Sequence, residues 1–276
     1  MGTSSSYRGP TSPRRLASSG SGDDNTNPPS GATSGAGSQG VGNPDPVQPG
    51  GNWSSAKTCL TRYAQTGGRV NLSRAARAYI AARGGARGAG KSAKSSKKAA
   101  LALGGFLSLA TKEGTEAALK KVGLGNYLNQ PAEVVLSALC DALCPAGTAR
   151  DDVASRQAMA TVLGELYDDL EAEGLDLNSL DSLNEERLAG LMKSFIAESI
   201  FRRWINDLGR CIERHAISEG EAVRLEREMR DWIHETVKLD LSSTKIFQAD
   251  WQSRTMSNTM DRIYIEAYRF LEDTEG

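Results

Sequence analysis

Through most of the chain, apolar side chains recur every three or four residues, the period of a helix with one buried face. A short helix is expected over residues 55–65, and a basic amphipathic stretch over residues 91–112. The longer predicted helices have the following inward positions: Leu72, Ala75, Ala76, Tyr79 and Ile80; Val135, Leu139 and Leu143; Met159, Leu163, Leu166 and Leu170; Leu188, Leu191, Met192, Phe195 and Ile196; Leu225, Met229, Trp232 and Ile233; Met256, Met260, Ile263, Ala267, Phe270 and Leu271. Only Lys245-Ile246-Phe247 indicates extended structure, so the predicted fold class is all-α, a helical bundle.

Residues that favour helix ends mark several boundaries. Asn71 is expected to cap one helix and Gly84 to end it. Ser218, with an acidic residue three positions later, is the start of a capping box, in which the serine hydroxyl accepts a hydrogen bond from a free amide of the first turn. From Asn184 onward the pattern predicts either one long helix or two helices joined near Glu198.

The first 52 residues depart from this pattern. Gly, Ser, Pro, Thr and Asn dominate them, and one leucine and two valines are their only large aliphatic side chains. A segment with so little to bury is predicted to be a disordered tail. The chain therefore divides into a tail over 1–52, a basic Ala/Arg/Gly-rich helical region over 53–123 and an acidic helical bundle over 124–276.

The net charge of −1 hides a strong asymmetry. Residues 1–123 hold 17 basic and 5 acidic side chains, whereas residues 124–276 hold 16 and 29. Between Lys57 and Lys98 there are eleven basic residues and no acidic one. Such a block attracts nucleic acid or an acidic protein surface, or it lies against the acidic half of its own chain. The candidate nucleic-acid-binding side chains are Arg74, Arg77, Arg83, Arg87, Lys91, Lys94, Lys97 and Lys98.

Composition argues against several classes of protein. Four cysteines in a chain of this length give no disulfide framework, which fits a reducing cytoplasm. With only His215 and His234 available, no metal site is expected, and no cofactor either. The longest weakly apolar run, residues 99–110, is well short of the about 20 residues that cross a bilayer. We therefore expect a cytoplasmic protein without a membrane segment.

Residues 85–92, Gly-Ala-Arg-Gly-Ala-Gly-Lys-Ser, satisfy the phosphate-binding P-loop pattern letter for letter. A P-loop follows a buried β-strand, but residues 74–83 are predicted to be helical, and no later segment supplies an apolar strand that ends in Asp. The sequence therefore favours a mobile glycine-rich linker between helices over nucleotide hydrolysis.

Two further pairs have a chemical and a structural interpretation. Cys211 and His215 lie four residues apart, as a thiolate–imidazole pair requires, but both fall on the apolar stripe of Trp204 and are predicted to be a packed core pair. Arg202 and Arg203 would suit a phosphate or carboxylate clamp, although such pairs more often solvate a helix or bind a neighbouring acid. No catalytic residue emerges, and the chain is not predicted to be an enzyme.

The N-terminus carries one reactive group. Because Gly2 is small, Met1 is expected to be removed, which leaves an α-amine with a pKa of about 8 that is a usable nucleophile at neutral pH. A coil of about 50 residues spans about 40 Å, so this amine would reach the active site of a partner.

Several segments, taken in order, are similar to one known family. They are the opening Met1-Gly2-Thr3-Ser4-Ser5-Ser6-Tyr7-Arg8-Gly9-Pro10, then Tyr63-Ala64-Gln65-Thr66-Gly67-Gly68, Leu143-Cys144-Pro145, Arg150-Asp151-Asp152, Ser155-Arg156, Phe195-Ile196-Ala197 and Ile200-Phe201-Arg202-Arg203-Trp204. Along the whole chain this order resembles the QatB family of the Qat anti-phage systems, in which QatB is encoded with an ATPase (QatA), a QueC-like deazaguanine enzyme (QatC) and a TatD-like nuclease (QatD).

The resemblance implies a non-catalytic defence component that acts as an adaptor and as a substrate. It implies that the QueC-like partner joins a deazaguanine acid, activated as an adenylate, to the amine of the terminal glycine, which here is Gly2. The partner's cleft would then grip Thr3, Ser4, Ser5, Ser6, Tyr7, Arg8, Gly9 and Pro10. The alternative is a nucleic-acid-binding sensor subunit that uses the basic region 57–98.

Overall fold

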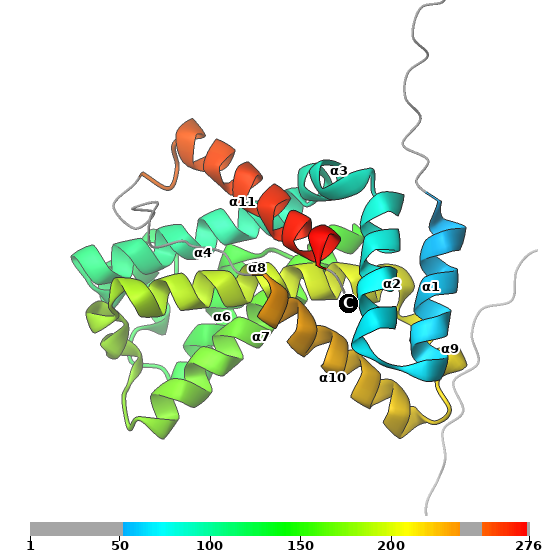
Figure 1. Cartoon of the computed structure of the whole chain (residues 1–276). Helices are drawn as coiled ribbons and strands as arrows, with labels where there is room; N and C mark the ends of the chain where they lie inside the picture. Colours follow the sequence, from blue (N-terminus) through cyan, green and yellow to red (C-terminus); the bar gives the residue numbers. More distant parts are fainter. Residues whose placement is uncertain (1–51, 238–249, 275–276) are drawn as a thin grey trace, which may run out of the picture. The chain divides into compact units, whose positions relative to one another are not determined.

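The computed structural model describes residues 52–237 and 250–274. The predicted tail up to residue 51, including Gly2 to Pro10, and the predicted extended segment Lys245-Ile246-Phe247 lie outside these residues. Within the described ranges every regular element is a helix, which confirms the all-α prediction (Figure 1). The α-helices are α1 (Trp53–Thr66), α2 (Arg69–Ala82), α3 (Gly85–Ser92), α4 (Lys94–Glu113), α5 (Thr115–Lys121), α6 (Ala132–Leu143), α7 (Arg150–Ala172), α8 (Glu185–Leu208), α9 (Arg210–His215), α10 (Glu219–Thr236) and α11 (Arg254–Asp273), with 3-10 helices η1 (Gly125–Tyr127) and η2 (Leu177–Ser182).

Helix α8 is the central element. It contacts α4, α7, α9, α10 and α11, and Figure 1 shows it running between α10 on one side and α11 on the other. Phe195 and Trp204 on α8 are almost fully buried, and burial of such side chains contributes about 1.5–3 kcal/mol each. Helices on both sides of residue 123 supply side chains to a single hydrophobic core.

The α1–α2 hairpin is anchored on the helices that follow it. The hydroxyl of Tyr63 donates a hydrogen bond to the carbonyl oxygen of Leu225 on α10, at 2.8 Å. The ring of Tyr79 stacks on Trp204, with the ring centroids 5.2 Å apart, and contacts Trp53 edge-on. Aromatic rings therefore connect the first turn of α1 to the buried face of α8.

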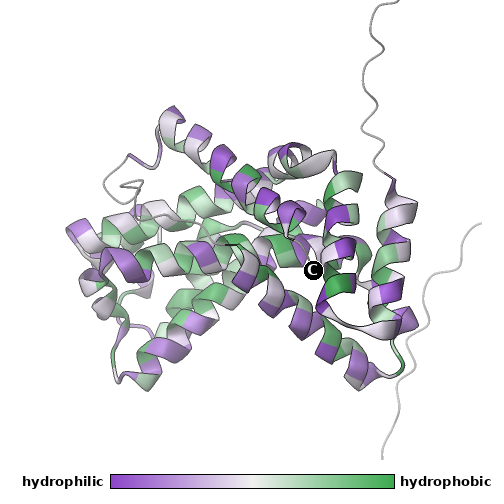
Figure 2. Cartoon of the chain, viewed as in Figure 1, coloured by the Kyte–Doolittle hydropathy of each residue, from purple (hydrophilic) through white to green (hydrophobic). Residues whose placement is uncertain are grey.

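Two helix starts follow the sequence signals. The side chain of Ser218 accepts a hydrogen bond from the amide of Glu221, and that of Asn184 accepts one from Arg187. Hydrophilic and hydrophobic positions alternate along α10 and α11 in Figure 2, as the apolar spacing predicts. Helix α8 continues through Glu198 and ends at Leu208, and α9 begins at Arg210. This part of the chain therefore forms two helices, but they join at Gly209 and not near Glu198.

The predicted cap at Asn71 is wrong. Helix α2 begins two residues earlier, at Arg69, directly after Gly67 and Gly68, which both have positive φ. The side-chain amide of Asn71 instead donates hydrogen bonds to the Thr66 hydroxyl and to the carbonyl oxygen of Gly67. Its polar group therefore closes the α1–α2 turn rather than capping a helix.

The prediction of a mobile linker at residues 85–92 is also wrong, because this segment is helix α3 and packs against α11. Glycine normally weakens a helix, but here its small size permits close packing. A Cβ atom on Gly90 would lie 2.9 Å from the backbone nitrogen of Ile265, closer than real Cβ atoms come. The segment before it is helix α2, so the strand that a P-loop follows is not there.

Gly104 on α4 is the second glycine that permits close packing, here against Trp251, which lies just before α11. A Cβ atom on Gly104 would lie 2.1 Å from the ring of Trp251, so only glycine leaves room for that ring. Among the described helices, none has the length and apolar character of a membrane-spanning segment.

Candidate functional site

Two charged residues of helix α8 are almost fully buried, Glu198 at 0% and Arg203 at 3% exposure. A buried charge without partners is costly, so the groups around each of them define a polar centre of the molecule. We call these the Glu198 cluster and the Arg203 cluster, and describe the Arg203 cluster first.

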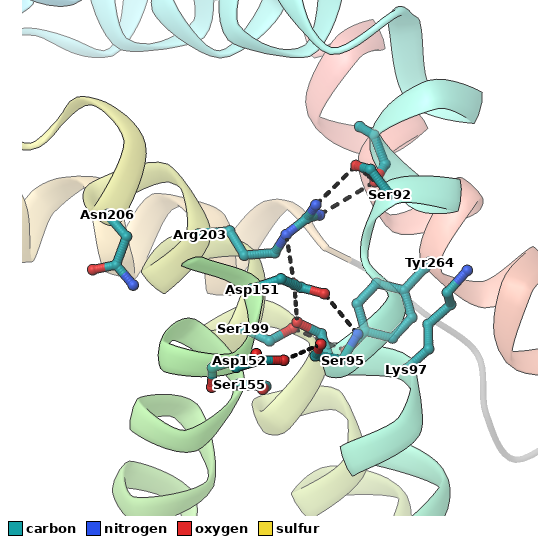
Figure 3. Close-up of polar contacts among 12 residues, drawn as sticks. Ser92, Ser95, Lys97, Asp151, Asp152, Ser155, Ser199, Arg203, Asn206 and Tyr264 are labelled. Atoms are coloured by element: carbon teal, nitrogen blue, oxygen red, sulfur yellow. Dashed lines mark hydrogen bonds and ion pairs between the residues drawn. The ribbon is translucent and has the colours of Figure 1, made fainter. Parts of the chain in front are cut away.

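Arg203 joins four helices. Its Nε lies 2.9 Å from Oδ1 of Asp151 on α7, and its Nη2 donates to the Ser92 hydroxyl on α3 at 2.8 Å. Its Nη1 donates to the carbonyl oxygen of Ala89 at 3.2 Å and to the hydroxyl of Tyr268 on α11. Figure 3 shows the guanidinium between Ser92 and Asp151. The planar fork of arginine suits this arrangement, because it presents five donors in fixed directions.

The two aspartates at the start of α7 hold α4. Asp151 accepts hydrogen bonds from the Ser95 amide at 2.6 Å and from the Ser96 hydroxyl at 2.9 Å. Asp152 accepts from the Ser95 hydroxyl and from the Ala149 amide, and these bonds lower the pKa of Asp152. The sequence placed both acids at the positive end of a helix, and they also satisfy the first turn of α4 (Figure 3).

Asp207, also on α8, has its own set of polar partners, separate from those of Arg203. Its side chain is 6% exposed and pairs with Arg83. Tyr79 donates its hydroxyl to Asp207 at 3.0 Å, and Nη1 of Arg150 lies 3.4 Å away. The guanidinium of Arg83 also lies over the rings of Tyr79 and Trp53, at 5.3 and 5.8 Å from their centroids.

The two sets meet at a cavity of about 170 Å³. Its lining residues lie on α3, α7 and α8 and directly after α2, and they are Arg83, Ser92, Arg150, Asp151, Arg203 and Asp207.

The Glu198 cluster has the opposite charge pattern. The carboxylate contacts Nε of Arg202 at 2.7 Å, Nε of Arg230 at 2.6 Å and Nε2 of His234 at 3.2 Å. Burial by itself would raise the pKa of Glu198, but the hydrogen bonds from His234 and Arg230 and the charge of Arg202 lower it to about 2. Arg230 also pairs with Glu165 on α7, so the cluster joins α7, α8 and α10.

A comparison of the sequence with protein families matches the family described as Qat anti-phage system associated protein QatB, over residues 84–271. The chain belongs to the QatB family. This confirms the resemblance, and membership makes the chain a component of the Qat anti-phage defence system. The matched residues begin just before α3 and end in α11, and they contain Glu198 and Arg203. Searches of curated proteins and of solved structures gave no significant match.

The basic region of this QatB-family chain is partly paired with its own acidic half. Arg69 pairs with Glu235, Arg83 with Asp207, and Lys97 with Asp261. For these three residues the intramolecular interpretation is correct. Of the eight candidate nucleic-acid-binding residues, six are exposed: Arg74, Arg77, Arg87, Lys91, Lys94 and Lys98.

The predicted core pair of Cys211 and His215 is wrong. Cys211 is only partly buried and His215 is exposed, whereas Ile212 is fully buried. The stripe through Trp204 ends with α8, and after Gly209 helix α9 turns a different set of side chains inward.

Arg202 and Arg203 each bind a neighbouring acid, which was the structural interpretation of that pair. The acid of Arg202 is Glu198, four residues earlier on the same helix, whereas the acid of Arg203 is Asp151 on α7, which spacing along the sequence could not show. Among the described residues no group of three or more His, Cys, Asp or Glu side chains is placed to hold a metal ion.

Proposed function

We propose that this chain is a non-catalytic adaptor of the Qat system, and that the amine of Gly2 is modified by a QueC-like partner. Family membership supports the place in the system. The opening Met1-Gly2 supports the chemistry, because removal of Met1 exposes an unhindered amine with a pKa of about 8. In this proposal Thr3 to Pro10 enter the cleft of QatC, the helical part docks QatA or QatD, and the protein works in the cytoplasm.

The adaptor role is supported by the way in which the buried charged side chains are paired within the protein. Glu198 and Arg203, the buried charged residues of the described part, contact protein groups on neighbouring helices rather than each other. Groups held in this way stabilise a helix arrangement, and they are poor nucleophiles or bases because their protons are fixed in ion pairs. The proposal therefore places the chemistry at the N-terminal amine and not at these two buried groups.

The proposed step is an acyl transfer. The Gly2 nitrogen attacks the acyl carbon of the deazaguanine adenylate, an amide bond forms, AMP leaves, and the amine loses a proton to solvent or to a base of the partner. The chain supplies only the nucleophile. The adenylate comes from ATP and the partner enzyme.

Intact-mass measurement tests this step. The chain is co-expressed with the neighbouring genes, with and without the QueC-like gene, and we expect a mass increase located on Gly2 only when that gene is present. Gly2→Pro, which lacks a primary amine, should abolish the increase, and Gly20→Ala, which lies beyond the segment from Thr3 to Pro10, should keep it. An unmodified N-terminus in cells where defence works would contradict the proposal.

A second candidate function is nucleic-acid binding, supported by the six exposed basic residues on α2, α3 and α4. Neutralisation of phosphates by such side chains makes the affinity fall steeply with salt. Fluorescence anisotropy with labelled DNA and RNA at 50 mM and 200 mM salt tests it. Binding that is undetectable at the lower salt concentration would remove this candidate.

A further inference from the structure

The cavity between α2, α3, α7 and α8 has an unbalanced lining. Three guanidinium groups, from Arg83, Arg150 and Arg203, face two carboxylates, from Asp151 and Asp207. One positive charge is therefore left without a counter-charge in the lining. Arg150 is the most exposed of the three guanidinium groups, and an anion bound beside it would supply the missing counter-charge.

Arg150 is the lining residue best placed to bind a ligand. Its side chain is 75% exposed, and its one ion pair among the described residues is the 3.4 Å contact with Asp207. Asp207 already accepts hydrogen bonds from Arg83 and from Tyr79. Arg150 therefore has most of its five donors available and a weakly held position from which it can turn towards a ligand.

The rest of the lining is rigid. Arg203 is almost fully buried and is fixed by contacts to α3, α7 and α11. Arg83 is held by Asp207 and by two aromatic rings. Groups fixed in this way keep their positive charge in place, so they need little reorganisation when an anion binds.

The size of the cavity restricts the ligand. A volume of about 170 Å³ has room for a phosphate group, whereas a nucleoside attached to that group would remain outside the cavity. Lys91 and Lys94, exposed and close to Ser92 in the sequence, add positive charge to the same region.

We propose that this cavity binds a phosphate group, either free phosphate or the terminal group of a small phosphate monoester, with Arg150 as the mobile contact. Arginine forks match the oxygens of phosphate, and such charge-assisted hydrogen bonds are stronger than neutral ones. The site is independent of the proposed acyl transfer at Gly2, so either can fail alone.

Titration of the full-length chain at low ionic strength tests the site. Inorganic phosphate, AMP and adenosine are added separately while calorimetry and tryptophan fluorescence are followed, because Trp53 lies under Arg83. We expect saturable binding of phosphate and AMP and none of adenosine. Equal affinities identify free phosphate as sufficient, and tighter AMP binding identifies a monoester. The absence of saturable phosphate and AMP binding overturns the proposal.

Two variants distinguish phosphate binding in the cavity from general attraction of phosphate to positive charge. Arg150→Ala should weaken phosphate binding about tenfold or more, which corresponds to the loss of one charge-assisted hydrogen bond. Arg69→Ala is the matched control, since Arg69 is also exposed and also has one ion pair. It should leave the affinity unchanged, and an equal loss in both variants would overturn the proposal.

The Asp207→Asn variant should change the affinity for phosphate in the opposite direction. It removes a carboxylate that competes with the ligand for Arg83 and Arg150. Phosphate should bind several-fold more tightly to this variant, an effect that general damage to the fold would not produce. Weaker binding to a variant that keeps its helical circular dichroism would count against the proposal.

Discussion

Glu198 and Arg203 lie on the same helix, five residues apart, yet their buried charges are compensated in opposite ways. Glu198 is an anion among three basic side chains, Arg202, Arg230 and His234. Arg203 is a cation with one carboxylate partner, and its other donors meet uncharged oxygens.

The difference shows how the chemistry of the buried group sets the architecture around it. A carboxylate is small, so long arginine side chains on α8 and α10 can reach it from the surface. A guanidinium has five donors in one plane, so acceptors must come from several helices. The Glu198 cluster is accordingly filled by its own side chains, and the Arg203 cluster borders a cavity.

Loss of the Arg203 side chain should have the largest effect. Arg203→Ala leaves Asp151 and the acceptors on α3 without their partner, and the free energy of unfolding should fall by about 3–5 kcal/mol. Urea denaturation followed by circular dichroism measures it. Arg203→Lys, which keeps the charge without the fork, should recover only part of the loss. A decrease below about 1 kcal/mol would show that the cluster is not a structural centre.

Glu198→Gln should have the next largest effect, and it should depend on pH. The folded state lowers the pKa of Glu198 from 4.5 to about 2. Such a shift corresponds to about 3 kcal/mol of stability at neutral pH. Because the pKa is lowered, this contribution is complete above pH 4.5 and is lost as the pH falls towards 2.

Urea unfolding of the wild type and of Glu198→Gln between pH 2 and pH 7 measures this contribution. The stability difference between wild type and Glu198→Gln should be largest at neutral pH and should shrink through the window from 4.5 to 2. Parallel pH profiles would contradict the assigned ion pairs.

A smaller effect is expected at Gly90, whose neighbour Ala89 accepts a hydrogen bond from Arg203. Gly90→Val forces α3 away from Ile265, and overpacking of this kind costs about 1–3 kcal/mol. Gly164→Ala on α7 is the control, because a Cβ atom there meets nothing within 4 Å. It should stabilise the helix slightly. Equal thermal midpoints for the two variants would show that the α3–α11 contact is loose.

The smallest effect is expected at an exposed ion pair, which sets the scale for the two buried clusters. Arg187 donates to both oxygens of Glu173, at 2.8 and 2.9 Å, in contact with solvent. Exposed pairs contribute little, because water and salt screen them. Arg187→Ala should leave the thermal midpoint almost unchanged, and a shift as large as that of Glu198→Gln would remove the distinction between buried and exposed pairs.

The features that could be predicted from the sequence are those that depend on residues close together in the chain. The cap at Ser218 and the start of α8 after Asn184 are local, since a side chain and an amide three residues away are enough. The helical class was readable for the same reason, because the apolar period is repeated in each segment.

What the sequence could not predict depends on distant contacts. Glycine is needed at position 90 because Ile265 lies against it, and Arg203 can be buried because three other helices supply its acceptors. His215 was misplaced because the helix breaks at Gly209, and in α9 it is Ile212 that is buried, which spacing alone does not reveal. The candidate residues Gly2 to Pro10 lie outside the described part, so their role rests on sequence and family.

The central position of α8 determines which backbone amides can exchange with solvent before the whole protein unfolds. Because this helix contributes to both charged clusters and has neighbouring helices on several sides, the amides of its buried middle, residues 195–204, are shielded from water while the molecule stays folded. Hydrogen exchange at those amides should therefore require global unfolding, and exchange at the exposed end of α1 should need only local fraying.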